Sequence, residues 1–340
     1  MDFEILFDIW ILKFELMIKI CFFGTPDYSL IVLEKLYQGH YPIVVIVTKP
    51  PRPNGRSQIL TPTPVAVWAK KNNLPLLTPA ANSDKPWLFL DEAEMIKEIR
   101  AFQPELLISA DYTQMIPQAL VNQVKYHGLN VHPSLLPAYR GPAPVPWAIA
   151  NGENETGVSI VTLSEKFDEG QVIAQEKEKI QSTDTTDMLL KRLFKKGAEL
   201  LIQVLTPPNL LLLRGGSEKS RQSNPPLGKR GGGSYYPRMT RNTGFEPWEN
   251  IKHAIESGTE AARIERKWRA FHPWPGLWTK VRVNSDKRKE ISEIRLKLLK
   301  VHLSLITSHL SPTLILDEIQ LEGKQILQKT DVTIFLHRFI

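Results

Sequence analysis

Asn130 and His132 are the two side chains of this sequence whose types and spacing most clearly suit chemistry. They stand two positions apart in an apolar run that begins at Gly128. Such a run favours a short buried strand, and side chains two apart on a strand point to the same face. The amide and the imidazole can therefore meet at the edge of a sheet, where open α/β folds bind ligands. An amide donor beside a titratable ring suits a reaction in which negative charge develops on a carbonyl oxygen.

Two further motifs accompany this pair. One is the loop Ser134-Leu-Leu-Pro137, and the other is Phe167-Asp-Glu-Gly170, which places Asp168 after a second apolar run. Read singly, each motif favours a structural role, because Asp and Gly are common in turns and a lone histidine is more often structural than catalytic. The combination and order of the motifs are what make them informative.

The elements that must position these residues alternate between strands and helices. This alternation predicts a mostly parallel, Rossmann-like sheet with helices on both faces. The turn Gly24-Thr-Pro-Asp27 lacks the glycine spacing that cradles a pyrophosphate, so the pattern does not indicate a dinucleotide site. We expect strands at 18–23, 43–48, 105–110, 128–131, 158–163 and 172–180, and helices at 29–38, 64–72, 96–102 (the end of a helix) and 186–205.

Length and charge indicate two domains with different surfaces. A chain of 340 residues is long for one core. Residues 1–205 hold 20 Lys and Arg against 23 Asp and Glu, whereas residues 206–340 hold 23 against 13. A basic back half is typical of a protein with a polyanionic partner, although a basic surface without a partner fits the charge equally well.

Composition divides the chain into four predicted parts. Residues 1–16 are apolar but interrupted by acidic side chains, unlike a secretory signal or a membrane span, and we expect an extension outside the fold. Residues 17–205 form the α/β domain, and 206–234 read as a flexible basic linker rich in Pro, Gly and Ser. Residues 235–340 predict a smaller β-rich, OB-like barrel with a helix at 250–271 and β-like runs at 277–283, 291–301, 313–316 and 332–336.

The single cysteine, Cys21, argues against a disulfide framework and a Cys-rich zinc site. It lies in an apolar run, so we expect a core residue rather than a nucleophile. A cytoplasmic location fits this cysteine usage.

Several segments, in order along the chain, resemble formyltransferases that use 10-formyltetrahydrofolate. The segment that carries most of the resemblance is Asn130-Val-His-Pro-Ser-Leu-Leu-Pro-Ala-Tyr-Arg-Gly141, continued by residues 146–152, 155–160 and 167–170. Two more segments are similar to the methionyl-tRNA formyltransferase family: Arg52-Pro-Asn-Gly-Arg56 with residues 60–65, and Phe271-His-Pro-Trp-Pro-Gly276. The resemblance is strong over residues 17–205 and weaker over 235–340.

The resemblance implies transfer of a formyl group from 10-formyltetrahydrofolate to the α-amine of methionine on initiator methionyl-tRNA. It implies that Asn130 and His132 stabilise an oxyanion and that Asp168 orients or charges the imidazole. It also implies a cytoplasmic, monomeric enzyme without a metal. The implied folate-binding residues are Ser134, Leu135, Leu136, Pro137, Leu107 and Tyr112, and the implied tRNA-binding residues are Arg52 and Arg56.

Some positions depart from the family pattern, and some alternatives stay open. Glu169 and Gln171 flank the turn after Asp168, and Thr113 stands where glycine is common. These departures bear on efficiency more than on reaction class. The alternatives are a formyltransferase acting on a purine ribonucleotide or an amino sugar, a hydrolase that releases formate from the same folate, and a non-catalytic tRNA-binding relative.

Overall fold

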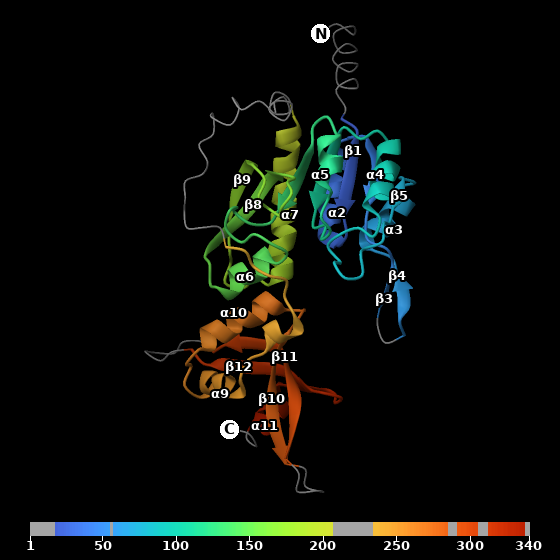
Figure 1. The fold of residues 1–340 in the computed structure, drawn as a ribbon. Helices are drawn as coiled ribbons and strands as arrows, with labels where there is room; N and C mark the ends of the chain where they lie inside the picture. Colours follow the sequence, from blue (N-terminus) through green and yellow to red (C-terminus); the bar gives the residue numbers. More distant parts are fainter. Residues whose placement is uncertain (1–17, 55–56, 207–233, 285–290, 305–311, 337–340) are drawn as a thin grey trace. The chain divides into compact units, whose positions relative to one another are not determined.

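The computed structural model of the chain describes residues 18–54, 57–206, 234–284, 291–304 and 312–336 (Figure 1). The chain forms two compact units. The predicted extension at 1–16 lies outside the described residues, as does the predicted linker at 206–234 apart from its two end residues. The first unit runs to Pro142 and also includes Gly157–Glu178 and Leu190–Tyr235, and the second comprises Ala143–Thr156, Lys179–Leu189 and the chain from Tyr236.

The first unit is built on a seven-stranded sheet. Its strands are β1 (Ile20–Gly24), β2 (Ile43–Val47), β5 (Leu76–Leu77), β6 (Leu106–Ala110), β7 (Gly128–His132), β8 (Glu155–Thr162) and β9 (Val172–Lys179). Their order is β5-β2-β1-β6-β7-β8-β9, in which β5 to β7 pair in parallel and β8 runs antiparallel to β7. The predicted mostly parallel, Rossmann-like sheet is confirmed.

Helices cover both faces of this sheet. Those of the unit are α2 (Asp27–Gln38), α3 (Pro64–Lys71), α4 (Glu92–Ala101), α5 (Gln118–Asn122) and most of α7 (Thr186–Leu205). Leu33, Val65 and Phe194 of α2, α3 and α7 share one core, and Met95 and Leu120 of α4 and α5 belong to the other. Because both faces are covered, strands such as β1 and β6 are buried at every residue, which explains their continuous apolar sequences.

Local signals account for several element boundaries. The Thr63 hydroxyl accepts from the backbone N–H of Ala66 at 3.0 Å, and Pro64 occupies the first turn of α3. Cys21 is fully buried in β1, as expected for a core cysteine, and burial raises the pKa of its thiol. Within the part of the chain that the structure describes, no helix has the length and apolar character needed to cross a membrane.

An exposed hairpin carries the segment around Arg52, where the sequence predicted no strands. It pairs β3 (Arg52–Asn54) with β4 (Ile59–Thr61) and projects from the first unit (Figure 1). All residues of both strands are exposed, including the apolar Ile59 and Leu60. Arg56 lies outside the described residues.

The second unit combines helices with a four-stranded antiparallel sheet in the order β10-β11-β12-β13. This sheet confirms the predicted smaller β-rich region and is consistent with a small barrel. The Trp147 and Phe271 rings, from the first and third of its α-helices, lie 6.0 Å apart. The elements are α6 (Pro144–Ala150), η2 (Arg241–Gly244), α9 (Trp248–Glu256), α10 (Ala261–Phe271), β10 (Leu277–Asn284), β11 (Ile291–Leu303), β12 (Leu314–Leu321), β13 (Ile326–Gln328) and α11 (Lys329–Leu336).

Two predicted elements of this unit are wrong. The single helix predicted at 250–271 is two helices, because Gly258 and Glu260 adopt left-handed backbone angles, with φ of 76° and 64°, between α9 and α10. The run predicted as β-like at 332–336 belongs to α11. Val332 and Phe335 are three residues apart and both pack in the core, which is a helical spacing.

Glu246 forms a buried charge cluster in the second unit. Its carboxylate accepts hydrogen bonds from Arg263 at 2.5 Å, Lys267 at 2.8 Å and Asn250 at 2.7 Å. Burial alone would raise the pKa of this carboxyl, but the bonds from Arg263, Lys267 and Asn250 outweigh it and lower the pKa to about 2. The ionised carboxylate is therefore the form that the fold stabilises.

Replacing Glu246 with Gln is expected to lower the free energy of unfolding at neutral pH by about 2 kcal/mol, because two cations lose their shared partner. Since the folded-state pKa is lowered from 4.5 to about 2, this stabilisation is present above pH 4.5 and is lost as the pH falls towards 2. Urea denaturation across this range measures it. Glu249→Gln, on the exposed start of α9, is the control. A deficit in Glu246→Gln that stays constant down to pH 2 would contradict the assignment.

Candidate active site

Strand β7 places Asn130 and His132 on one face of the sheet. Asn130 lies opposite Ser109 of β6, and His132 lies opposite Ser159 of β8. The intervening Val131 points into the core on the other side. Asn130 is half-buried and His132 is 4% exposed. The two side chains therefore share the carboxyl edge of the parallel strands, where this class of sheet binds ligands.

Asp168 lies next to both side chains. Its Oδ1 is 3.3 Å from Asn130 Nδ2 and 3.4 Å from His132 Nδ1, and its Oδ2 accepts from the backbone N–H of Gly141 at 2.9 Å. The side chains of His132 and Asp168 are only 5% and 8% exposed. The structure thus brings the three predicted catalytic residues together, with partners for both carboxylate oxygens.

The second ring nitrogen of His132 also faces an acceptor. Nε2 is 3.0 Å from the carbonyl oxygen of Tyr139. A neutral imidazole carries one N–H, whereas a protonated ring carries two and can donate to Asp168 and Tyr139 at once. The ring is therefore held between two acceptors, one at each nitrogen.

The turn that carries Asp168 depends on its glycine. Asp168 has a left-handed φ of 57°, and a Cβ on Gly170 would lie 1.8 Å from the carbonyl oxygen of Thr162. The backbone N–H of Gln171 then donates to the Thr162 hydroxyl at 2.8 Å. The spacing Asp-x-Gly is needed here so that the turn can pack closely on β8 and direct the carboxylate towards β7.

Ser159 of β8 fixes the loop at residues 134–137. Its hydroxyl donates to the carbonyl of Ser134 at 2.6 Å and accepts from the N–H of Leu136 at 3.1 Å. The amide of Gln175 donates to both the Ser159 hydroxyl and the Leu136 carbonyl at 2.8 Å. These bonds occupy several backbone groups of the loop. The half-buried Leu135 and exposed Pro137 remain as its surface.

The other residues predicted to bind folate or tRNA have their described contacts outside the cluster of Asn130, His132 and Asp168. Leu107 is fully buried, and Tyr112 is 7% exposed in the same core. The Tyr112 hydroxyl donates to Gln114 at 3.0 Å, and its ring lies 5.4 Å from that of Phe23. Arg52 is on the exposed hairpin. The roles predicted for these residues remain predictions.

Sequence reasoning missed the residues that support the three side chains. Tyr139 and Gly141 act through backbone atoms, which leave no trace in side-chain type. Ser159 did leave a signal, because it is a polar residue inside the apolar strand Gly157-Val-Ser-Ile-Val161. A buried hydroxyl in such a strand needs partners, and here they are the loop carbonyl and amide.

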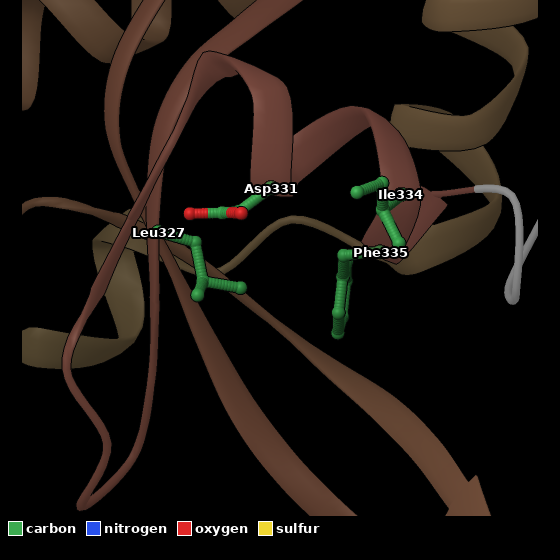
Figure 2. Close-up of a pocket in the computed structure, with 4 residues that line it drawn as sticks. All are labelled: Leu327, Asp331, Ile334 and Phe335. Atoms are coloured by element: carbon green, nitrogen blue, oxygen red, sulfur yellow. The ribbon is translucent and has the colours of Figure 1, made fainter.

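Two other features bear on possible ligands. Among the described residues, no group of three or more His, Cys, Asp or Glu side chains is arranged to hold a metal ion. A small cavity of about 210 Å³ in the second unit is lined by Leu327, Asp331, Ile334 and Phe335 (Figure 2). It has one carboxylate among three apolar side chains and shares no residue with the cluster at Asp168.

The family model described as formyl transferase matches residues 18–205. Methionyl-tRNA formyltransferase of Halalkalibacterium halodurans is 36% identical over 261 residues, covering 77% of this chain and 74% of that protein. The enzyme of the same name from Bacillus cereus is 38% identical over 263 residues, covering 77% and 75%. Both alignments extend well beyond the matched domain.

Solved structures support the same fold. A crystal structure of HypX from Aquifex aeolicus in complex with tetrahydrofolic acid matches with a TM-score of 0.52 at 15% identity, covering 93% of this chain and 47% of that one. A variant of the same protein matches with a TM-score of 0.54 at 14% identity, covering 93% and 48%. At this level of identity the likeness concerns the fold alone.

Proposed function

Since this chain belongs to the formyl transferase family, we propose that the cluster of Asn130, His132 and Asp168 transfers a formyl group to the α-amine of methionine on methionyl-tRNA. The donor is 10-formyltetrahydrofolate. The observation that carries the proposal is the approach of one carboxylate oxygen of Asp168 to both Asn130 Nδ2 and His132 Nδ1. We infer the acceptor from the relatives aligned over 77% of this chain, because these are methionyl-tRNA formyltransferases.

The geometry divides the work among the three side chains. The reaction forms a bond between the amine nitrogen and the formyl carbon and breaks the bond from that carbon to the folate nitrogen. Negative charge develops on the formyl oxygen as the amine attacks. The Asn130 amide has two N–H groups, one directed at Asp168, so the other can donate to this oxygen.

His132 handles the proton balance. The attacking amine must lose a proton, and the departing folate nitrogen must gain one. The first proton can pass to His132 through Asp168 or an intervening water and return by the same route to the folate nitrogen. Asp168 stabilises the protonated ring through Nδ1, and the Tyr139 carbonyl does so through Nε2. The loop at 134–137, held by Ser159, supplies a fixed apolar wall beside the cluster for the donor.

The RNA partner is supported by charge and exposure. Arg52 projects on an exposed hairpin, and the back half of the chain is strongly basic. Guanidinium groups on such a hairpin can contact phosphates and base edges at an RNA end. We propose the initiator form of the tRNA as the preferred acceptor, with a monomeric enzyme acting in the cytoplasm where initiation takes place.

An acceptor survey tests the proposal. Purified protein and 10-formyltetrahydrofolate are mixed with initiator methionyl-tRNA, elongator methionyl-tRNA, uncharged tRNA, glycinamide ribonucleotide, a nucleotide amino sugar, or buffer. We expect fast tetrahydrofolate release only with charged tRNA, and faster with the initiator form. Equal release in buffer would identify a hydrolase, and release with either small amine would replace the proposed acceptor.

A further inference from the structure

Arg140 and Glu169 form an ion pair beside the catalytic cluster. Arg140 Nη1 lies 2.8 Å from Glu169 Oε1, with the two side chains 23% and 40% exposed. Glu169 directly follows Asp168 in sequence, and Arg140 stands between Tyr139 and Gly141. The ion pair therefore joins the two segments that surround the imidazole.

The same two segments meet at other points. The Tyr139 carbonyl accepts from His132 Nε2 when that nitrogen carries its proton, and the Gly141 N–H donates to Asp168 Oδ2. Tyr139 and Asp168 are not glycines, yet both have left-handed backbone angles, with φ of 56° and 57°. Such conformations persist only where surrounding contacts hold them. The Arg140–Glu169 pair is a side-chain contact that spans both strained positions.

The backbone of Arg140 also makes contacts, with residues 234 and 235. Its N–H donates to the carbonyl of Ser234 at 3.0 Å, and it forms a parallel bridge with Tyr235. Arg140 thus links residues 234–235 with the loop at 139–141 and, through Glu169, with the turn that carries Asp168. The loop is fixed from two directions.

We propose that Arg140 and Glu169 are positioning residues, whose ion pair holds the Tyr139 carbonyl and the Gly141 N–H against the imidazole and carboxylate. The inference rests on the proposed function for its kinetic consequences, whereas the Arg140–Glu169 ion pair and its hold on the loop at 139–141 are properties of the fold. When the pair is broken, the loop moves from Asp168, the imidazolium loses part of its support, and kcat falls while substrate binding is retained. A small displacement of catalytic groups commonly costs one to two orders of magnitude in rate.

A neighbouring lysine provides a matched control. Lys166 Nζ lies 3.6 Å from the other oxygen of Glu169 and is 77% exposed. It brings the same charge to the same carboxylate from three residues earlier in the same turn. Lys166→Ala therefore removes a cation from Glu169 without cutting the link to Arg140.

The test compares Glu169→Ala, Glu169→Gln, Arg140→Ala, the Arg140→Ala/Glu169→Ala double variant and Lys166→Ala. Two readouts are measured: hydrogen exchange of the Gly141 amide, and kcat and KM for formyl transfer. In Glu169→Ala we expect exchange at Gly141 to speed up and kcat to fall about 10-fold with KM within about 2-fold. For Glu169→Gln, which keeps an acceptor, kcat and the exchange rate should lie between those of Glu169→Ala and wild type. The kcat of the double variant should be no lower than that of the less active single variant.

The outcomes distinguish the positioning role of the ion pair from the proposed function. Faster exchange at Gly141 together with the fall in kcat supports the positioning role. If the wild type proves inactive but exchange at Gly141 is still faster in Glu169→Ala, the positioning role stands and the proposed function fails. Unchanged exchange and unchanged kcat in Glu169→Ala would overturn the positioning role. An equal loss in Lys166→Ala would also overturn it, because charge near Glu169 would then matter rather than its link to the loop.

Discussion

Asn130→Ala is expected to lower kcat for formyl transfer by about 10²–10³-fold, with the Kd for methionyl-tRNA unchanged. The amide lies on β7, half-buried, with one N–H directed at Asp168 Oδ1. It is placed to donate to the formyl oxygen only as charge develops there, so its loss acts on the transition state more than on the bound substrates. Single-turnover kinetics with saturating donor, together with a filter-binding titration of the tRNA, measure the two quantities.

The control for this variant is Asn122→Ala, which removes an exposed amide at the end of α5 and should retain wild-type kinetics. Thermal unfolding of both variants checks that the sheet is intact. A fully active Asn130→Ala enzyme would remove the amide from the mechanism and leave the developing charge without its proposed donor.

His132→Ala is expected to lower kcat by about 10²–10⁴-fold, the range of a general acid–base group. The ring is nearly inaccessible and lies between Asp168 and the Tyr139 carbonyl, so no exposed side chain can take its place in the same geometry. Single-turnover kinetics of wild type and variant with saturating donor measure the loss.

His253→Ala, which removes an exposed ring from α9, serves as the comparison and should keep the wild-type rate. If His132→Ala retained the wild-type rate, the proton would have to move through another group, and the role given to Asp168 would fail with it.

The sequence predicted the central elements of this site because their signals are local. The i, i+2 spacing of Asn130 and His132 in an apolar run indicated a shared strand face, and the Asp-x-Gly spacing indicated a turn at Asp168. Alternating strands and helices predicted the parallel sheet. Each of these properties follows from periodicity or turn chemistry over a few residues.

Other parts of the site depend on contacts between distant residues. The bonds from Ser159 to the loop, and the contacts of Tyr139 and Gly141 through backbone atoms, follow from the register of β7 against β8. Glu169 stood out in the sequence only as a departure from the family pattern. In the structure it holds Arg140, so the departure acquires a specific role that composition and spacing could not indicate.

The errors in the second unit have a similar origin. The helix predicted over 250–271 overlooked Gly258, although glycine commonly follows the end of a helix. Glu260 carries no such signal, yet it also has a left-handed φ. The apolar run at 332–336 is compatible with a strand or a helix, and only packing against the neighbouring sheet selects the helix.

In the proposed reaction, Asn130, His132 and Asp168 pass a formyl group from folate to the methionine amine of a charged tRNA. The most direct measurement follows a ¹³C-labelled formyl group from 10-formyltetrahydrofolate, with mass spectrometry of the aminoacyl group released from the tRNA. We expect labelled N-formylmethionine with wild-type protein and at least 100-fold less in the same time with Asn130→Ala or His132→Ala. Labelled formate in place of N-formylmethionine, or equal product from the variants, would contradict it.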